Sequence, residues 1–179
     1  MIPPDVVPAP GFPDSVARIA AIKKAVLAAK PPRAVFLSSI EGEKTSGLGV
    51  VTTAHLLEEA IPLVATEDIG RIGTETLLQT WQGNRFIEIS GPTYYSPNDV
   101  AAVLEMALGR PVAGVAVPRE TWVDTLAEHG MPADRSGASI EMTDSFNSRW
   151  IAFGGPGTEH VKGTIDLVTA VKSPTRRAS

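Results

Sequence analysis

The chain has 179 residues and a formal net charge of -4, and 43% of its residues are hydrophobic while 20% are charged. This balance fits a folded chain of one domain or two small lobes and excludes a disordered protein. The acidic charge, without a basic stripe interleaved with aromatic residues, argues against nucleic-acid binding, and the absence of cysteine excludes disulfides, thiolate metal sites and a cysteine nucleophile.

The sequence also bears on where the protein is found. Its first residues, "MIPPDVVPAPGFPD", contain no cationic patch followed by an apolar run. No stretch approaches the roughly 20 apolar residues that cross a bilayer. These features predict a soluble cytoplasmic protein without a membrane partner.

The first predicted elements are a helix and a strand. Residues 14–29 predict a helix that two prolines end, with apolar residues at helical spacing: Val16, Ile19, Ile22, Val26 and Ala29. The run "RAVFLSS" at 33–39 predicts a strand that is buried on both faces, as in a parallel sheet. A helix that leads directly into such a strand is half of a βαβ unit.

Two further helices and a strand are predicted next. A helix over residues 52–61 is stopped by Pro62, and a second over residues 63–83 carries Glu67 and Asp68 in its first turn. Its two internal glycines, Gly70 and Gly73, predict close helix packing. Residues 84–91 then predict a strand that places Phe86, Glu88 and Ser90 on the face opposite Ile87 and Ile89.

The helix over residues 96–109 has the clearest local signals. Ser96 is placed as N-cap, Pro97 at the first helical position, Asp99 as its capping-box partner and Gly109 as C-cap. A strand over 113–118, a helix over 119–130 and a short helix within 160–171 follow, whereas residues 132–163 show no assignable pattern. The alternation of helices and strands predicts an α/β fold.

Candidate site residues cluster between residues 38 and 59. Ser38 and Ser39 close the predicted strand, either as groups that bind a ligand at the carboxyl end of a parallel sheet or as simple strand caps. His55 shares a helical face with two carboxylates, so it is either a donor facing that crevice or a half-buried histidine paired with a carboxylate. No second histidine lies one turn away, so no metal site is predicted.

The order of these pieces resembles one family. The strand ending in two serines, the "SGLG" loop, "TTAHLLEE", "VATEDIGR" and "YYSPNDVAAVLEMALGRPV" are similar to the NmrA-like family of atypical short-chain dehydrogenase/reductases. The resemblance implies an α/β fold in which residues 1–61 form part of an NAD(P)-binding Rossmann domain. Residues 62–172 would form a small C-terminal α/β substrate lobe, and residues 173–179 a disordered tail.

The sequence departs from the family in two places. It contains no glycine-rich fingerprint for the pyrophosphate, and a further strand that the family has between positions 61 and 62 is missing. These departures predict an incomplete Rossmann-type parallel sheet whose strand edges and apolar helix faces lack partners. We therefore expect marginal stability, or burial of these faces against another chain in a homo-oligomer.

The resemblance also implies site residues. Ordinary short-chain dehydrogenases use a Tyr and, four residues on, a Lys, but alignment places Val51 and His55 at these positions. Ser39 can still bind a carbonyl oxygen and His55 can donate a proton, so these two are the implied catalytic residues. The residues implied for NADP or NAD binding, near the nicotinamide, are Pro3, Pro4, Ser38, Ser39 and His55.

The function implied is that of an NmrA-like NAD(P)H-dependent oxidoreductase of a small carbonyl or quinone. The alternative is a non-catalytic protein, either a dinucleotide sensor or a regulatory protein-binding module. The absence of the Tyr and Lys pair favours this alternative. A truncated product without activity is a third alternative.

Overall fold

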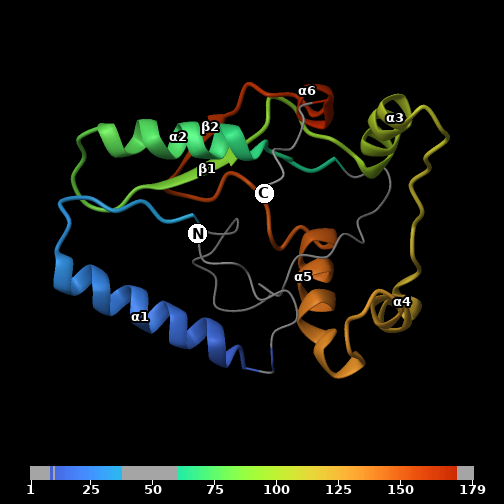
Figure 1. Cartoon of the computed structure of the whole chain (residues 1–179), viewed down its shortest axis with the longest axis horizontal. Coiled ribbons are helices and arrows are strands. Elements are labelled where there is room, and N and C mark those ends of the chain that lie inside the picture. The colour runs from blue at the N-terminus through green and yellow to red at the C-terminus, as the bar shows by residue number, and fades with distance from the viewer. Residues whose placement is uncertain (1–8, 10, 38–59, 173–179) are drawn as a thin grey trace, which may run out of the picture. The chain divides into compact units, whose positions relative to one another are not determined.

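The computed structural model describes residues 9, 11–37 and 60–172 (Figure 1). These residues fall into two compact units, one with residues 9, 11–36 and 117–150 and the other with residues 37, 60–116 and 151–172. The elements are α1 (Pro13–Ala29), α2 (Thr66–Leu78), β1 (Phe86–Ser90), α3 (Pro97–Leu108), the 3-10 turn η1 (Arg119–Thr121), α4 (Trp122–Glu128), the 3-10 turn η2 (Ala133–Arg135), α5 (Gly137–Asn147), β2 (Thr158–Lys162) and α6 (Leu167–Lys172). No helix within these ranges is both long and apolar enough to cross a membrane.

A parallel pair of strands forms the sheet of the second unit. β1 pairs with β2 in a register that sets Phe86 opposite Thr158 and Ser90 opposite Lys162. Arg85, at the start of β1, donates two hydrogen bonds of 2.7 Å to the carboxylate of Glu159 and so joins the strands at that end. The predicted α/β fold with an incomplete parallel sheet is confirmed. The division at residues 61 and 172 stays a prediction.

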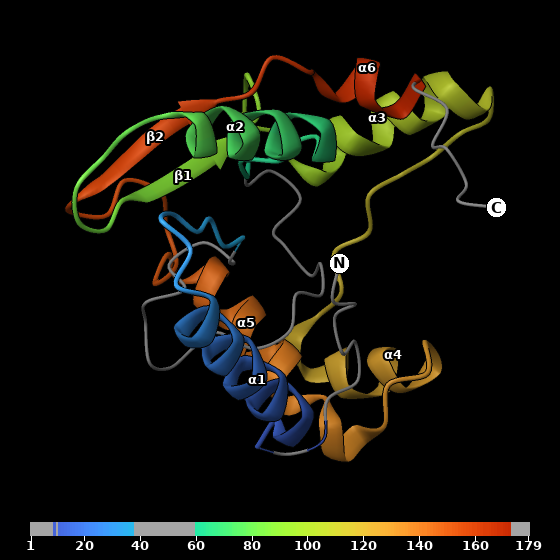
Figure 2. The ribbon, with the colours of Figure 1, turned by 60° about the vertical axis from the view of Figure 1, so that its left-hand side comes forward.

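Three helices accompany this sheet. α2 lies alongside the two strands in both ribbon views (Figures 1 and 2) and buries Asp68, Ile72 and Thr76. α3 and α6 lie in contact with each other (Figure 2). The segment before α2 joins the same unit, because Ile61 and Tyr95 form an antiparallel bridge with backbone hydrogen bonds of 2.9 and 3.0 Å.

The caps of α3 confirm the sequence prediction. The Ser96 hydroxyl accepts a hydrogen bond from the Asp99 backbone N–H at 3.2 Å, and the Asp99 carboxylate accepts one from the Ser96 backbone N–H at 2.8 Å. Gly109 ends the helix with φ of 63°, a left-handed conformation that glycine adopts without a steric penalty. Residues at its own two ends therefore supply the signals that begin and end this helix.

The first unit contains α1, α4 and α5. α1 matches its predicted range but buries none of its side chains. α5 lies within the stretch that the sequence left unassigned. Its buried residues include Ser139, Thr143 and Ser145, and the Thr143 hydroxyl donates to the Ser139 carbonyl at 2.9 Å. Because hydroxyl residues occupy much of the buried face, the helix shows no apolar periodicity in the sequence.

Two predicted strands are wrong in the described residues. Residues 33–37 form no strand, and Leu37 is 77% exposed. Residues 113–118 form none either, and Val115 is 78% exposed. A strand persists only when a neighbour pairs with its backbone groups, and the described sheet consists of β1 and β2 alone.

Two smaller predictions also fail. The helix predicted to end at Ile61 does not reach it, because residues 60 and 61 are not helical and Ile61 pairs with Tyr95 instead; residues 52–59 of that prediction lie outside the described residues. Gly70 and Gly73 do not mark close packing, because a Cβ atom added at either would meet no atom within 4 Å. Helix packing therefore does not require glycine at these two positions.

Candidate functional site

The site residues implied by the sequence lie outside the described residues. This holds for the five cofactor and catalytic residues together: Pro3, Pro4, Ser38, Ser39 and His55. Their roles therefore stay predictions. The described residues show instead what lies at the carboxyl ends of the two parallel strands, where ligands bind in open α/β sheets.

At the end of β1, Ser90 contacts His160 of β2. The Ser90 side chain is fully buried, and its hydroxyl donates to the Gly91 carbonyl at 3.0 Å. A hydroxyl has one proton, so His160, whose Nε2 lies 2.8 Å from the same oxygen, is the donor in this second bond. This pattern places an imidazole proton on Nε2 and orients the ring of His160 against Ser90.

Aromatic rings and a carboxylate surround His160. Its ring centroid lies 5.6 Å from that of Phe153, and Phe153 lies 6.3 Å from Tyr94, both in tilted arrangements. Glu88, opposite His160 in the strand register, accepts a hydrogen bond from the Gly154 backbone N–H at 2.7 Å. The loop at 153–155 therefore packs on the face of the sheet that carries Glu88 and His160.

The chemistry open to this pair is limited. Ser90 is buried and its proton is held by a carbonyl group, so it orients the imidazole rather than acting as a nucleophile. No partner for His160 could be predicted, because the two residues are 70 positions apart and β2 was not predicted. The only signal in the sequence was the position of Ser90 on the strand face opposite Ile87 and Ile89.

At the end of β2, the carboxylate of Asp68 holds the loop that follows the strand. Asp68 Oδ2 accepts hydrogen bonds of 2.8 Å from the backbone N–H groups of Thr164 and Ile165. Its Oδ1 lies 2.8 Å from the Arg71 guanidinium and accepts from the Thr164 hydroxyl at 3.3 Å. The side chain is 1% exposed.

The ionisation of Asp68 follows from these contacts. Burial alone raises the pKa of this carboxyl, but the hydrogen bonds from Arg71, Ile165 and Thr164 outweigh burial and hold the pKa below its usual value. The group is therefore a carboxylate at neutral pH. The sequence pattern predicted Asp68 in the first turn of a helix, but it did not indicate the loop about 96 residues further along the chain that Asp68 binds.

These contacts also test whether the described end of the sheet fits a dinucleotide. Consecutive backbone N–H groups after a strand form the kind of cradle that binds a phosphate, but Asp68 occupies those of Thr164 and Ile165. At the end of β1, Gly91 packs so closely on the Leu63 carbonyl that a Cβ atom would collide with it. The described strand ends therefore do not fit the pyrophosphate of NAD(P).

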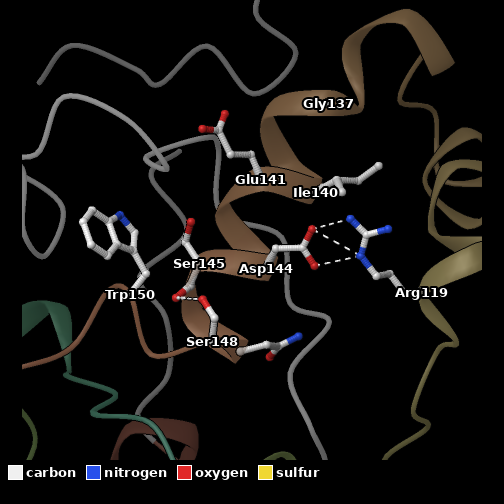
Figure 3. A pocket seen from close by; sticks show the side chains of 9 residues that line it. Arg119, Gly137, Ile140, Glu141, Asp144, Ser145, Ser148 and Trp150 are labelled. Carbon is white, nitrogen blue, oxygen red and sulfur yellow. Dashed lines mark hydrogen bonds and ion pairs between the residues drawn. The ribbon is translucent and has the colours of Figure 1, made fainter.

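The first unit has an open depression of about 790 Å³ along α5. Figure 3 shows Asp144 pointing from α5 toward Arg119, with Trp150 on the other side. Arg119 donates to Asp144 at 2.9 Å through Nε, and its guanidinium lies 5.7 Å from the ring centroid of Trp122. The hydrogen bonds from Arg119 lower the pKa of the Asp144 carboxyl against a smaller effect of burial. No sequence motif indicated a role for these residues.

Among the described residues, no group of three histidine, aspartate or glutamate side chains is placed to hold a metal ion.

Comparisons with known proteins give one distant similarity. No family model matches the chain, and no solved structure matches it. A stretch of 85 residues is 29% identical to an NAD(P)H azoreductase of Xenophilus azovorans, and it covers 48% of this chain but only 30% of the azoreductase. Over about half of its length, the chain is thus distantly similar to an NAD(P)H azoreductase.

Proposed function

We propose that the chain is an NmrA-like, NAD(P)H-dependent oxidoreductase of a small carbonyl or quinone. The observation that carries this proposal is the similarity to an NAD(P)H azoreductase over 85 residues. The α/β fold with its parallel strand pair is compatible with it, and so is the order of motifs that resembles the NmrA-like family.

The proposed site uses the residues that the resemblance implies. Ser39 would donate a hydrogen bond to the carbonyl oxygen of the acceptor, and His55 would donate a proton to it. Ser38, Pro3 and Pro4 would line the nicotinamide side. Because Asp68 occupies the loop after β2, the cofactor's phosphates would bind away from the described strand ends.

The test combines binding and turnover. Titration calorimetry with NADPH and NADH is expected to show micromolar binding by the purified chain, and a quinone or an aldehyde should then be reduced with oxidation of the cofactor. His55→Gln should lower turnover without changing the melting temperature. His129→Gln is the matched control, since His129 is an exposed histidine whose Nδ1 contacts the Thr125 carbonyl at 2.7 Å.

Each outcome has a definite meaning. Binding without turnover for any quinone or aldehyde would contradict the enzymatic proposal and favour the dinucleotide sensor. An unchanged rate in His55→Gln would remove His55 from the proposed site. Absence of binding at millimolar cofactor would contradict the proposal as a whole.

A further inference from the structure

We propose that the loop at residues 163–165, with Arg71, is a carboxylate-binding cradle that uses the side chain of Asp68 as its built-in ligand. When that carboxylate is removed, the cradle should bind a free carboxylate of the same size, namely formate. In the native chain, the occupied cradle is closed to external anions. This inference does not depend on the proposed function.

The first support is the convergence of donors on one group. Two consecutive backbone N–H groups, of Thr164 and Ile165, both lie 2.8 Å from the same oxygen, Asp68 Oδ2. Arg71 and the Thr164 hydroxyl donate to the other oxygen. All four contacts come from groups that can donate hydrogen bonds, so the site suits an anion and not a cation.

The second support is the space at Gly163. A Cβ atom at this position would collide with Asp68 Oδ2 and would lie 2.8 Å from Asp68 Cγ. Glycine is thus the residue that leaves room for a carboxylate against the backbone. The Gly163 backbone N–H donates to the Ser90 carbonyl at 2.7 Å, which ties the cradle to the end of β1.

The third support is the separation of the ligand from the cradle. Asp68 belongs to α2 and reaches a loop 96 and 97 positions further along the chain. Its side chain is almost wholly buried, so its truncation would leave the backbone N–H groups of Thr164 and Ile165 without the acceptor that they have in the native chain. A free carboxylate would restore that acceptor and the ion pair with Arg71, and both interactions favour its binding.

The test is chemical rescue of Asp68→Ala. The alanine methyl and one formate ion together replace the atoms of the aspartate side chain. Formate, compared with sodium chloride at equal ionic strength, should raise the melting temperature of this variant saturably. At a formate concentration ten times its dissociation constant, the ratio of folded to unfolded protein should rise about elevenfold by mass action.

The controls isolate the cradle. The native chain should respond to formate no more than to chloride, because Asp68 already occupies the site. Glu75→Gln removes the other carboxylate on Arg71, which lies 3.1 Å away and is exposed, and should behave as the native chain does. If Asp68→Ala is unfolded without salt, circular dichroism should show that formate, and not chloride, folds it.

Two results would overturn the inference. One is a formate effect on Asp68→Ala equal to that of chloride, whether the variant begins folded or unfolded. The other is an equal formate effect on the native chain, which would show a general salt response. Amide resonances of Thr164 and Ile165 that shift with formate in the variant alone would support it directly.

Discussion

Replacement of Gly163 by alanine tests how tightly α2 is joined to the sheet. The new methyl group would collide with the carboxylate of Asp68. Because the Gly163 backbone is held by the Ser90 carbonyl, we expect the carboxylate to move rather than the loop. It would then lose its hydrogen bonds to the backbone N–H groups of Thr164 and Ile165.

The size of the effect follows from those contacts. A hydrogen bond to a charged group contributes about 1.5 to 3 kcal/mol, and the displaced carboxylate would lose two of them, whereas its contact with the partly exposed Arg71 is weakened by water. We therefore expect Gly163→Ala to lower the free energy of unfolding by about 3 to 5 kcal/mol, a large part of the roughly 5 to 15 kcal/mol typical of a domain.

Urea unfolding followed by circular dichroism measures this loss. The midpoint should fall, while the dependence of the unfolding free energy on urea stays the same. The same substitution made in Asp68→Ala should cost at least about 2 kcal/mol less, because the colliding carboxylate is gone. The reasoning is refuted if Gly163→Ala unfolds as the native chain does, or if its cost is equal in both backgrounds.

Three further perturbations have expected outcomes. Gly73→Ala should raise the unfolding free energy by about 0.5 to 1 kcal/mol in the same urea assay, because alanine favours a helix and its Cβ meets open space; a loss would contradict this. Ser96→Ala should lower the melting temperature through a cost of about 1 kcal/mol for the lost N-cap, and an unchanged value would show that the cap does not stabilise the chain. Folding lowers the pKa of the Asp68 carboxyl from 3.8. Its contribution to stability is therefore complete above a pH of about 4 and is lost as the pH falls through the lowered value. When the pH is lowered from 6 to 2, the urea midpoint of Asp68→Asn should fall less steeply than that of the native chain.

Local signals predicted much of the secondary structure. The capping box at Ser96, the alternation in β1 and the helical spacing of α1 each depend on residues close in sequence, and all three elements have their predicted character. The strands predicted at 33–37 and 113–118 depended on neighbours that the described sheet does not provide. Strand formation is a property of a pair, so an apolar run alone does not determine it.

The contacts at the strand ends could not be predicted in the same way. β2, with the sequence "TEHVK", has neither an apolar alternation nor a continuous apolar run, and it pairs with a strand about 70 residues earlier. Without β2, His160 had no predicted partner, and Asp68 had no loop to bind. The sequence therefore indicated the residue types at this edge of the sheet but not which of them meet.

Calorimetry with NADPH and NADH tests most directly whether the chain binds a nicotinamide dinucleotide, as we propose. Light scattering on the same sample reports whether a second copy is present, as the exposed strand edges and helix faces predict. We expect micromolar binding by a defined assembly. No heat of binding at millimolar concentrations of either dinucleotide would contradict it.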